Sequence, residues 1–195
     1  MNIIWHGHSC FEITGKDGTI VFDPYQANSV PGLNSLKLKA NLVLCSHEHD
    51  DHNARNCVEV APKDFKVACI ETYHDHHQGS HRGKNTIHIV DFEDLKVVHM
   101  GDIGCMMDDV SKLKNCDILM IPIGGYYTID TKEALKYIER IKPRIVIPMH
   151  YRSHEFGYDV LSTNEEFIQQ SSSVTYVDDC LEVNKDTKKQ TVVFK

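Results

Sequence analysis

Four potential metal ligands fall within six residues of this chain, in the order H-x-H-x-D-H: His47, His49, Asp51 and His52. They follow the apolar run Leu42–Cys45 after a single serine, so a strand would deliver the chain to the edge of a sheet and a polar turn would then present the ligands together. In a strand, His47 and His49 would share one face, because side chains repeat every two residues, and could chelate one ion. The other two ligands would point toward a second ion. A solvated polar loop is the alternative interpretation, but these residue types in this order predict a metal site.

The chain has 195 residues, which is enough for one sizeable hydrophobic core and short for two. Its hydrophobic content of 41% and charged content of 25% are those of an ordinary soluble globular protein. No internal repeat, low-complexity tract or linker divides it. We therefore expect a single domain over residues 1–195.

Charge and cysteine content limit the partners and the compartment. A net charge of −7 and a pI near 6.0 argue against nucleic acid and anionic membranes as partners. Bound cations would nevertheless make the site itself locally positive. The first residues, MNIIWHGHSC, do not read as a signal peptide, and no stretch approaches the roughly 18 apolar residues of a membrane span. The 7 cysteines, with no C-x-x-C pair, favour reduced thiols in the cytoplasm.

Short β-rich runs recur along the chain and predict strands. The continuous apolar runs among them (LVLC, DILMI, RIVIP) are typical of strands buried on both faces, which implies helices packed outside the sheet. The predicted strands are Ile3–Trp5, Cys10–Ile13, Thr19–Phe22, Leu42–Cys45, Val67–Ile70, Thr86–Val90, Leu95–His99, Ile118–Ile121, Ile145–Pro148, Val174–Val177, Cys180–Val183 and Thr191–Phe194.

Helices are fewer and shorter. The sequence D-T-K-E from Asp130 resembles a capping box, which predicts a helix to about Ile141 that ends before Pro143. Thr163-x-x-Glu166 predicts a second helix to about Gln170. The segment after His52 and residues 108–114 are weaker candidates. The fold class is therefore mixed α/β, with the chemistry carried on loops.

Two metal ions need more ligands than the first motif supplies. Three further candidates stand just past predicted strands: His74, Asp102 in a Gly-Asp pair, and His150. Each alone could be a surface loop residue, a turn former or a strand-end histidine. All three at strand ends, behind a complete H-x-H-x-D-H, are better explained together as metal ligands.

The order of these motifs resembles the metallo-β-lactamase fold superfamily of hydrolases. The chain is similar within it to the small Zn-dependent hydrolases related to ascorbate-6-phosphate lactonase. The matching segments are G-H-S-C-F at residues 7–11, F-D-P at 22–24, Gly101-Asp102, P-I-G-G at 122–125 and P-M-H-Y at 148–151. The resemblance implies a four-layer αββα sandwich with the site at one edge between two sheets.

The resemblance also implies a ligand assignment. One metal would be held by His47, His49 and His74, the second by Asp51, His52 and His150, and Asp102 would bridge the two ions. Asp23 would brace the ligand loop from behind. A set of imidazoles and carboxylates without thiolate suits two divalent ions of zinc or manganese, with iron as a further option. Position 49 is His, whereas the flavodiiron branch has Glu there, which lowers the odds of an O₂- or NO-reducing function.

The implied chemistry is hydrolysis. A water shared between two cations would lose its proton near neutral pH, and the same ions would polarise a carbonyl or phosphoryl oxygen. We therefore expect a dinuclear metal-dependent hydrolase that uses a metal-bridging hydroxide. Asp102 would hold the ions together, and Asp51 and His8 are candidates for moving the proton. For His8, a purely structural role is an equally good interpretation.

Basic residues near the predicted ligands indicate the substrate. Arg82 and Lys84 follow His74 in a loop with two glycines, in a protein of net charge −7, and favour a small anionic substrate, a lactone or phosphoester. Arg152 and His154, just past His150, are expected at the same opening. A solvated polar loop is the alternative interpretation of these residues.

Two other functions stay open. A nuclease or cyclic-nucleotide phosphodiesterase would use the same metals, but the chain lacks a basic arm to grip a polynucleotide. A metal-binding protein with little turnover would be expected to have lost some of the seven ligands. The expected partner is a small-molecule substrate, and a homo-oligomer remains open.

Overall fold

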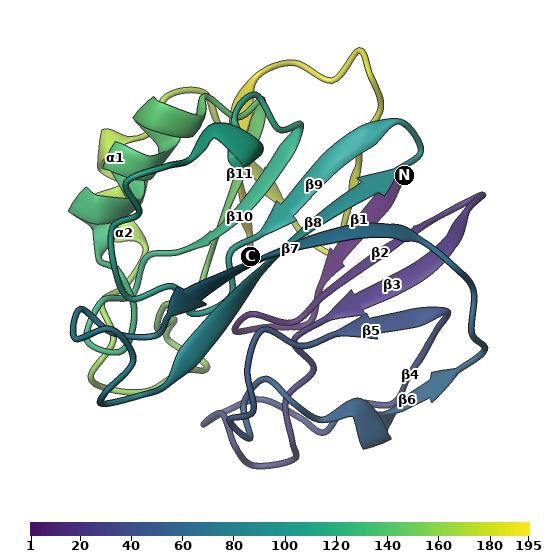
Figure 1. The fold of residues 1–195 in the computed structure, drawn as a ribbon, viewed down its shortest axis with the longest axis horizontal. Coiled ribbons are helices and arrows are strands. Elements are labelled where there is room, and N and C mark those ends of the chain that lie inside the picture. Colours follow the sequence, from purple (N-terminus) through teal and green to yellow (C-terminus); the bar gives the residue numbers. More distant parts are fainter.

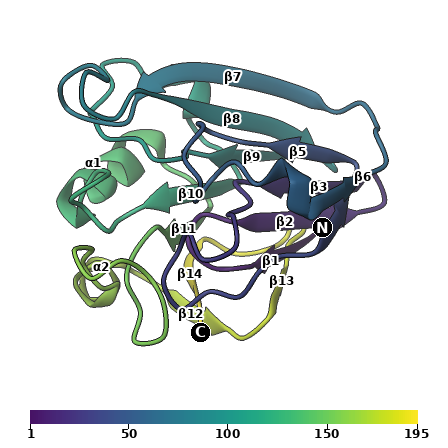
Figure 2. The ribbon, with the colours of Figure 1, turned by 90° about the horizontal axis from the view of Figure 1, so that it is seen from below.

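Two β-sheets face one another across the molecule (Figures 1 and 2). The structure is a computed structural model that describes residues 1–195. The 5-stranded sheet has the order β13 (Cys180–Glu182), β1 (Asn2–Trp5), β2 (Phe11–Gly15), β3 (Gly18–Phe22) and β5 (Leu42–Leu44). The 7-stranded sheet has the order β12 (Val174–Val177), β14 (Gln190–Phe194), β11 (Ile145–Met149), β10 (Ile118–Pro122), β9 (Leu95–His99), β8 (Lys84–Phe92) and β7 (Lys66–Tyr73). The predicted strands are all confirmed.

The main core fills the space between the two sheets. It is a cluster of 18 buried residues, among them Phe11 and Phe22 from the smaller sheet and Val97, Met120 and Ile147 from the larger one. Burying one such side chain stabilises a fold by roughly 1.5–3 kcal/mol. This shared apolar layer holds the two sheets, and hence the loops at their common edge, in a fixed relation.

Two helices cover the outer face of the larger sheet: α1 (Thr131–Ile141) and α2 (Glu165–Gln170). Ala134 and Tyr137 of α1 pack in a second buried cluster with Leu119 and Val146 of the sheet. β10 and β11 are consequently buried at every residue, as their continuous apolar sequences predict. Figure 1 shows both helices beside β10 and β11, away from β1, β2 and β3. Neither helix has the length and apolar character that crossing a membrane would require.

The outer face of the smaller sheet has a different cover. Its buried cluster combines Val21 of β3 with Tyr25 and Val30 of the following loop and with residues of a 2-stranded parallel sheet, β4 (Leu38–Ala40) and β6 (Val58–Val60). The 3₁₀ helix η1 (Arg55–Cys57) precedes β6. The layer order is that of an αββα sandwich, with this outer layer reduced to loops, short strands and a 3₁₀ turn.

The helix boundaries confirm one prediction and correct another. The Asp130 side chain accepts the Glu133 N–H and the Glu133 side chain accepts the Asp130 N–H, so the capping box of α1 is formed. α2 ends at Gln170, as predicted, but it begins at Glu165 after Asn164, which makes no side-chain capping bond, so the start predicted from Thr163 is too early. The weaker candidates are only 3₁₀ turns, η1 and η2 (Ser111–Leu113).

The sheets bring several strand ends to one edge. β3 and β5 are parallel, and so are β9, β10 and β11. β7 pairs antiparallel with β8, and β8 antiparallel with β9, so β7 runs in the same direction as β9. The segments that leave these strands carry Asp23, His47, His74, Asp102 and His150. The topology thus gathers residues that lie far apart in the sequence.

Candidate metal centre

The H-x-H-x-D-H segment lies in a turn and not in a strand. β5 ends at Leu44, and residues 46–52 form bends and turns, closed by the His52 N–H donating to the His49 carbonyl at 2.9 Å. The turn expected after the strand is therefore confirmed, whereas the strand face that His47 and His49 were expected to share is not formed. Their rings nevertheless lie close, with centroids 4.6 Å apart, because the turn folds the segment on itself.

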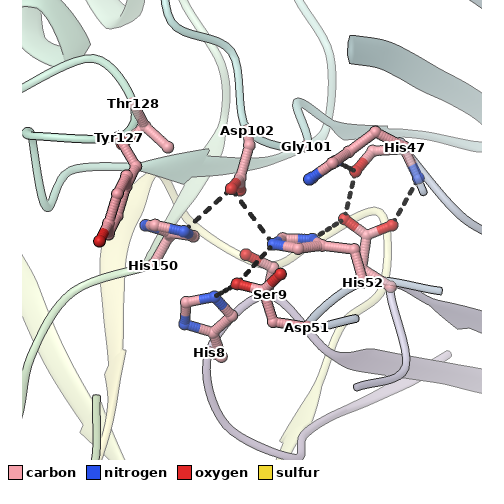
Figure 3. Close-up of polar contacts among 12 residues, drawn as sticks. His8, Ser9, His47, Asp51, His52, Gly101, Asp102, Tyr127, Thr128 and His150 are labelled. Atoms are coloured by element: carbon pink, nitrogen blue, oxygen red, sulfur yellow. Dashed lines mark hydrogen bonds and ion pairs between the residues drawn. The ribbon is translucent and has the colours of Figure 1, made fainter. Parts of the chain in front are cut away.

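Three overlapping groups of potential ligands form at this edge, each with its ligand atoms within 4.8 Å of one another. The groups are His47, His49 and His74; His47, His52 and Asp102; and His8, Asp51, His52 and His150. The structure thus brings together all of the residues that the sequence suggested as ligands. It adds His8, which the sequence suggested as a proton carrier or a structural histidine and not as a ligand. Figure 3 shows how His8, Asp51, His52, Asp102 and His150 point toward one another.

Asp102 lies at the centre of the cluster. Its Oδ2 is 2.9 Å from His150 Nε2, 3.2 Å from His52 Nε2 and 3.3 Å from His74 Nε2. Burial favours the neutral acid, but His150 and His52 outweigh it and hold the pKa of Asp102 well below its usual range. Gly101 precedes it with φ +56°, and a side chain there would collide with Ser46 and Asn85. An anionic carboxylate therefore lies among the imidazoles in a fixed position.

The fit of these residues to metal ions can be tested on their unsatisfied atoms. His47 Nε2, His52 Nε2 and Asp102 Oδ1 are buried and make no hydrogen bond of good geometry, although His52 Nε2 lies 3.2 Å from Asp102 Oδ2. Each such atom typically costs about 1–3 kcal/mol if it stays unsatisfied. All three belong to one ligand group, and a divalent cation is the partner that imidazole nitrogens and a carboxylate oxygen share. The residues present fit a metal centre.

Asp23 fixes the ligand segment from behind. One carboxylate oxygen accepts the Ser46 N–H at 2.6 Å, and the other accepts the Ser46 hydroxyl at 2.6 Å and lies 2.8 Å from His52 Nδ1. Burial opposes its ionisation, but His52 and His99 outweigh burial and lower the pKa of Asp23. An ionised Asp23 makes His52 Nδ1 the donor, which leaves Nε2 free to face the cluster. This is the arrangement expected of a carboxylate that orients a metal-binding imidazole.

Two other imidazoles are oriented in the same way. His47 Nδ1 lies 2.9 Å from the Ser46 hydroxyl, and His74 Nδ1 lies 3.1 Å from the carbonyl oxygen of Tyr127. Because a carbonyl can only accept, His74 donates from Nδ1 and keeps Nε2 for the cluster. The role of Tyr127 could not be predicted from the sequence, because any residue supplies a backbone carbonyl.

His8 is fully buried and has a left-handed backbone conformation, with φ +53°. Its Nε2 is 3.2 Å from Asp51 Oδ2, and its ring centroid is 4.1 Å from that of His150. Burial is the largest of the effects that lower the pKa of His8 to about 4, so the imidazole is neutral at physiological pH. The Tyr158 hydroxyl, which donates to the Ser29 carbonyl at 2.7 Å, also lies 3.2 Å from Asp51 Oδ2. Tyr158 was missed because it lies in an irregular stretch that carries no motif.

A hollow of about 310 Å³ opens over the cluster. Its lining residues are His49, Asp51, His74, Arg82, Asp102, Tyr127, His150 and Tyr158. The structure therefore places Arg82 beside the candidate ligands. A neighbouring hollow of about 400 Å³ is lined by Lys84 and shares Arg82 and His49 with the first. Lys84 is exposed, lies 3.8 Å from Glu71 and, unlike Arg82, does not line the hollow over the cluster.

Other basic residues lie elsewhere. Arg152 and His154 line a separate hollow with Trp5 and Phe156, and Arg152 Nε donates to the Leu161 carbonyl. The structure thus separates these two residues from the opening over the cluster, contrary to expectation.

Two histidines that were not assigned to the metals are both buried. His88 is buried and lies 3.1 Å from the Cys45 carbonyl. His99 is fully buried beneath the site, where its ring stacks on that of Phe22.

Comparisons with known proteins agree with this geometry. The Beta-lactamase superfamily domain matches residues 2–150. A UPF0173 metal-dependent hydrolase of Staphylothermus marinus is 31% identical over 212 residues, which cover 87% of this chain and 90% of that protein. A UPF0173 metal-dependent hydrolase of Thermoplasma acidophilum is 29% identical over 192 residues, which cover 80% and 85% of the two chains.

A solved structure shares the whole fold. It is a proposed Zn-dependent hydrolase of the metallo-β-lactamase superfamily from Thermotoga maritima, with a TM-score of 0.80 and 27% identity over 99% of this chain and 97% of that one. The chain therefore belongs to the β-lactamase superfamily and, within it, to the UPF0173 metal-dependent hydrolases. It is a metal-dependent hydrolase whose potential metal ligands form the His/Asp cluster.

Proposed function

We propose that this hydrolase uses two divalent ions, zinc or manganese with iron as a further option, to cleave a small anionic lactone or phosphoester. One observation carries the proposal: the central group, which contains Asp102, shares His47 with one of the other two ligand groups and His52 with the other, so two cations can be held side by side around Asp102. When bound, two such cations supply a hydroxide nucleophile near neutral pH and polarise the oxygen of the bond to be cleaved.

The proposed ligand assignment follows the groups. One ion would be held by His47, His49 and His74. The other would be held by Asp51, His52 and His150. Asp102 would contact both ions through its carboxylate group. Asp102 Oδ2 already lies close to imidazoles, whereas Asp102 Oδ1 is buried without a partner and is therefore available to bind an ion. His8 completes the group around Asp51.

The proposed proton carrier is Asp51. Its side chain is partly exposed (16%) and lines the hollow, whereas His8 behind it is fully buried. His8 and Tyr158 both contact Asp51 Oδ2 and hold the carboxylate in place. Burial opposes ionisation of Asp51, and the neighbouring His52 and His8 lower its pKa below the usual range. In this proposal His8 positions Asp51 and exchanges a proton with it, without contacting the substrate.

A small substrate is supported by the size and the charge of the site. The hollow of about 310 Å³ matches the lower end of small-molecule pockets, roughly 300–1,000 Å³. Arg82 supplies a positive group at its rim in a chain of net charge −7.

We also propose that the protein acts in the cytoplasm. All 7 cysteines are unpaired in the structure, as expected in a reducing compartment.

The experiment that tests the proposal counts metal and turnover together. Purified protein reconstituted with zinc or manganese should bind about two ions per chain by elemental analysis. The same protein should hydrolyse members of a panel of lactones and phosphodiesters, and a chelator should abolish that activity. Binding of one ion or none, after reconstitution with zinc, manganese and iron in turn, would refute the dinuclear site.

Replacing Arg82 by Ala should weaken the binding of an anionic substrate and leave the binding of a neutral one almost unchanged. A charge-assisted contact is worth roughly 1.5–3 kcal/mol, so the KM for glucono-1,5-lactone 6-phosphate should rise on the order of tenfold to a hundredfold. The KM for the unphosphorylated lactone should hardly change, and the metal content should stay the same.

Lys84→Ala is the matched control for Arg82→Ala. It removes the same charge two residues along the chain, from a side chain that is exposed and near Glu71. Its effect on KM should be smaller. Equal losses on both lactones, or the same loss from Lys84→Ala, would show that Arg82 has no specific contact with the charged group.

A further inference from the structure

Arg82 has no acidic partner in the structure, although it is half-buried. Its guanidinium lies over the rings of Tyr127 and Tyr126, 5.1 and 5.9 Å from their centroids, and it forms no ion pair. Lys84 nearby does lie close to a carboxylate, that of Glu71. A guanidinium held on aromatic faces beside a hollow keeps its donors available for an anion.

The backbone that carries Arg82 is organised around one carboxylate. Asp75, only 2% exposed, accepts four backbone N–H bonds from its own loop. Its Oδ1 accepts from His77 at 2.7 Å and Gly79 at 3.0 Å. Its Oδ2 accepts from His81 at 3.1 Å and Arg82 at 2.8 Å. The carboxylate therefore holds both arms of the loop, and one of its bonds ends on Arg82 itself.

The ends of the loop are fixed as well. The His74 N–H donates to the Gly83 carbonyl at 3.1 Å, so the loop begins and ends at one point beside a candidate metal ligand. Tyr127 contributes twice, since its carbonyl accepts from His74 Nδ1 and its ring lies under Arg82. The position of Arg82 relative to the ligand cluster is thus set by Asp75 on one side and Tyr127 on the other.

We propose that Asp75 is a positioning residue, which holds residues 76–83 so that Arg82 binds the phosphate or carboxylate of the substrate at the rim of the metal hollow. The inference rests on the proposed function, because it assigns the anion contact to that same site. It adds a residue that neither the ligand motif nor the charge pattern singles out. It also fixes where the substrate carries its charge, which is at the Arg82 side of the hollow and apart from the bond that is cleaved.

Asp75→Asn is the most informative variant because it keeps the size of the side chain. An amide has one oxygen, so whichever way it is turned, one pair of N–H groups faces an NH₂ group and loses its acceptor. Asp75→Ala removes all four bonds. Asp109→Asn is the matched control, since Asp109 is an exposed aspartate that accepts bonds from Ser111 in a different loop.

Hydrogen exchange tests whether Asp75 holds the loop of residues 76–83, and it needs no anionic ligand. In zinc-loaded Asp75→Ala, the amides of His77, Gly79, His81 and Arg82 should exchange at least about tenfold faster than in the wild type, because their acceptor is gone. Asp109→Asn should leave these four amides unchanged. Unaltered exchange in Asp75→Ala would overturn the assignment of Asp75 as the residue that holds this loop.

Ligand affinity tests the role in anion binding. We would measure by calorimetry the affinities of zinc-loaded protein for 6-phosphogluconate and gluconate, which differ by one phosphate and are stable. We expect both Arg82→Ala and Asp75→Asn to reduce the preference for the phosphorylated ligand by roughly tenfold or more. The double variant should be no worse than Arg82→Ala alone, because Asp75 acts through Arg82.

The outcomes separate the inference from the proposed function. If Arg82→Ala leaves the preference unchanged, or the wild type has none, the anion contact itself fails, and the role of Asp75 in binding fails with it. If Arg82→Ala removes the preference but Asp75→Asn keeps it, the inference alone is overturned. Additive losses in the double variant, or loss of zinc from Asp75→Asn, would also overturn it, because Asp75 would then act on something other than Arg82.

Discussion

Replacing Asp102 by Asn should lower kcat/KM by about a hundredfold or more and reduce the bound metal below two ions per chain. Several kcal/mol of charge stabilisation depend on two cations held close together, and each 1.36 kcal/mol corresponds to about a tenfold change in rate. Asp102 is the one carboxylate that contacts His52, His74 and His150 together. Asparagine keeps its shape but loses the negative charge and one acceptor.

The fold should tolerate this change. The backbone N–H of Asp102 donates to Asn85 Oδ1 at 2.8 Å, a bond that does not depend on the side chain. The melting temperature of the metal-free protein should therefore change much less than the activity. Asp91→Asn is the control, because Asp91 is an exposed carboxylate on β8 that pairs with Lys66 away from the cluster. Turnover near the wild-type level in Asp102→Asn would refute its role between the metals.

The sequence predicted the strands well for a simple physical reason. Strands such as β10 and β11 are continuous apolar runs buried on both faces, and no loop needs such a composition. The two elements that it missed, β4 and β6, are three residues each and include the exposed residues Lys39 and Glu59, so neither shows a hydrophobic period. α2 was expected too early, because a Thr-x-x-Glu pattern does not specify whether the chain enters the helix at Thr163 or at Asn164.

The ligands were suggested by residue type and position, whereas their geometry was not. His47 and His49 approach one another within the turn and not on a shared strand face, and the other ligands follow strands whose order only the fold determines. The ligands could be predicted because strand ends meet at one edge of the sheets. That property of the topology does not depend on whether the H-x-H-x-D-H segment itself is extended.

Arg152 and His154 were expected at the opening over the metal cluster because they follow His150 closely in the sequence. His150 has a left-handed φ of +52°, and the next residue, Tyr151, belongs to the second buried cluster, which includes residues of α1. The chain therefore turns away from the metal cluster directly after His150, and its next basic residues line another hollow. Arg82, eight positions past His74, returns to the site because Asp75 folds its loop back.

Replacing both His47 and His49 by Ala should abolish hydrolysis. These residues supply two of the three ligand atoms in one group, and His74 alone cannot hold a divalent ion. Elemental analysis should show the loss of at least one ion per chain. Because His47 also belongs to the group of His52 and Asp102, the second ion should bind more weakly.

Folding should survive the double substitution better than metal binding does. His49 is exposed, and His47 Nε2 is a buried nitrogen that has no partner unless metal is bound. Removing it should therefore cost the metal-free protein little stability, while the stabilisation that added zinc gives to the wild type should be lost. Thermal unfolding with and without zinc measures this difference.

The matched control for this pair is His6→Ala with His154→Ala, which removes two imidazoles outside all three ligand groups. That variant should keep two ions, its zinc-dependent stabilisation and its activity. If the variant lacking His47 and His49 still bound two ions and hydrolysed the same substrates, the H-x-H-x-D-H segment would not be the metal site. The buried nitrogens and the Asp102 oxygen at the sheet edge would then need another partner.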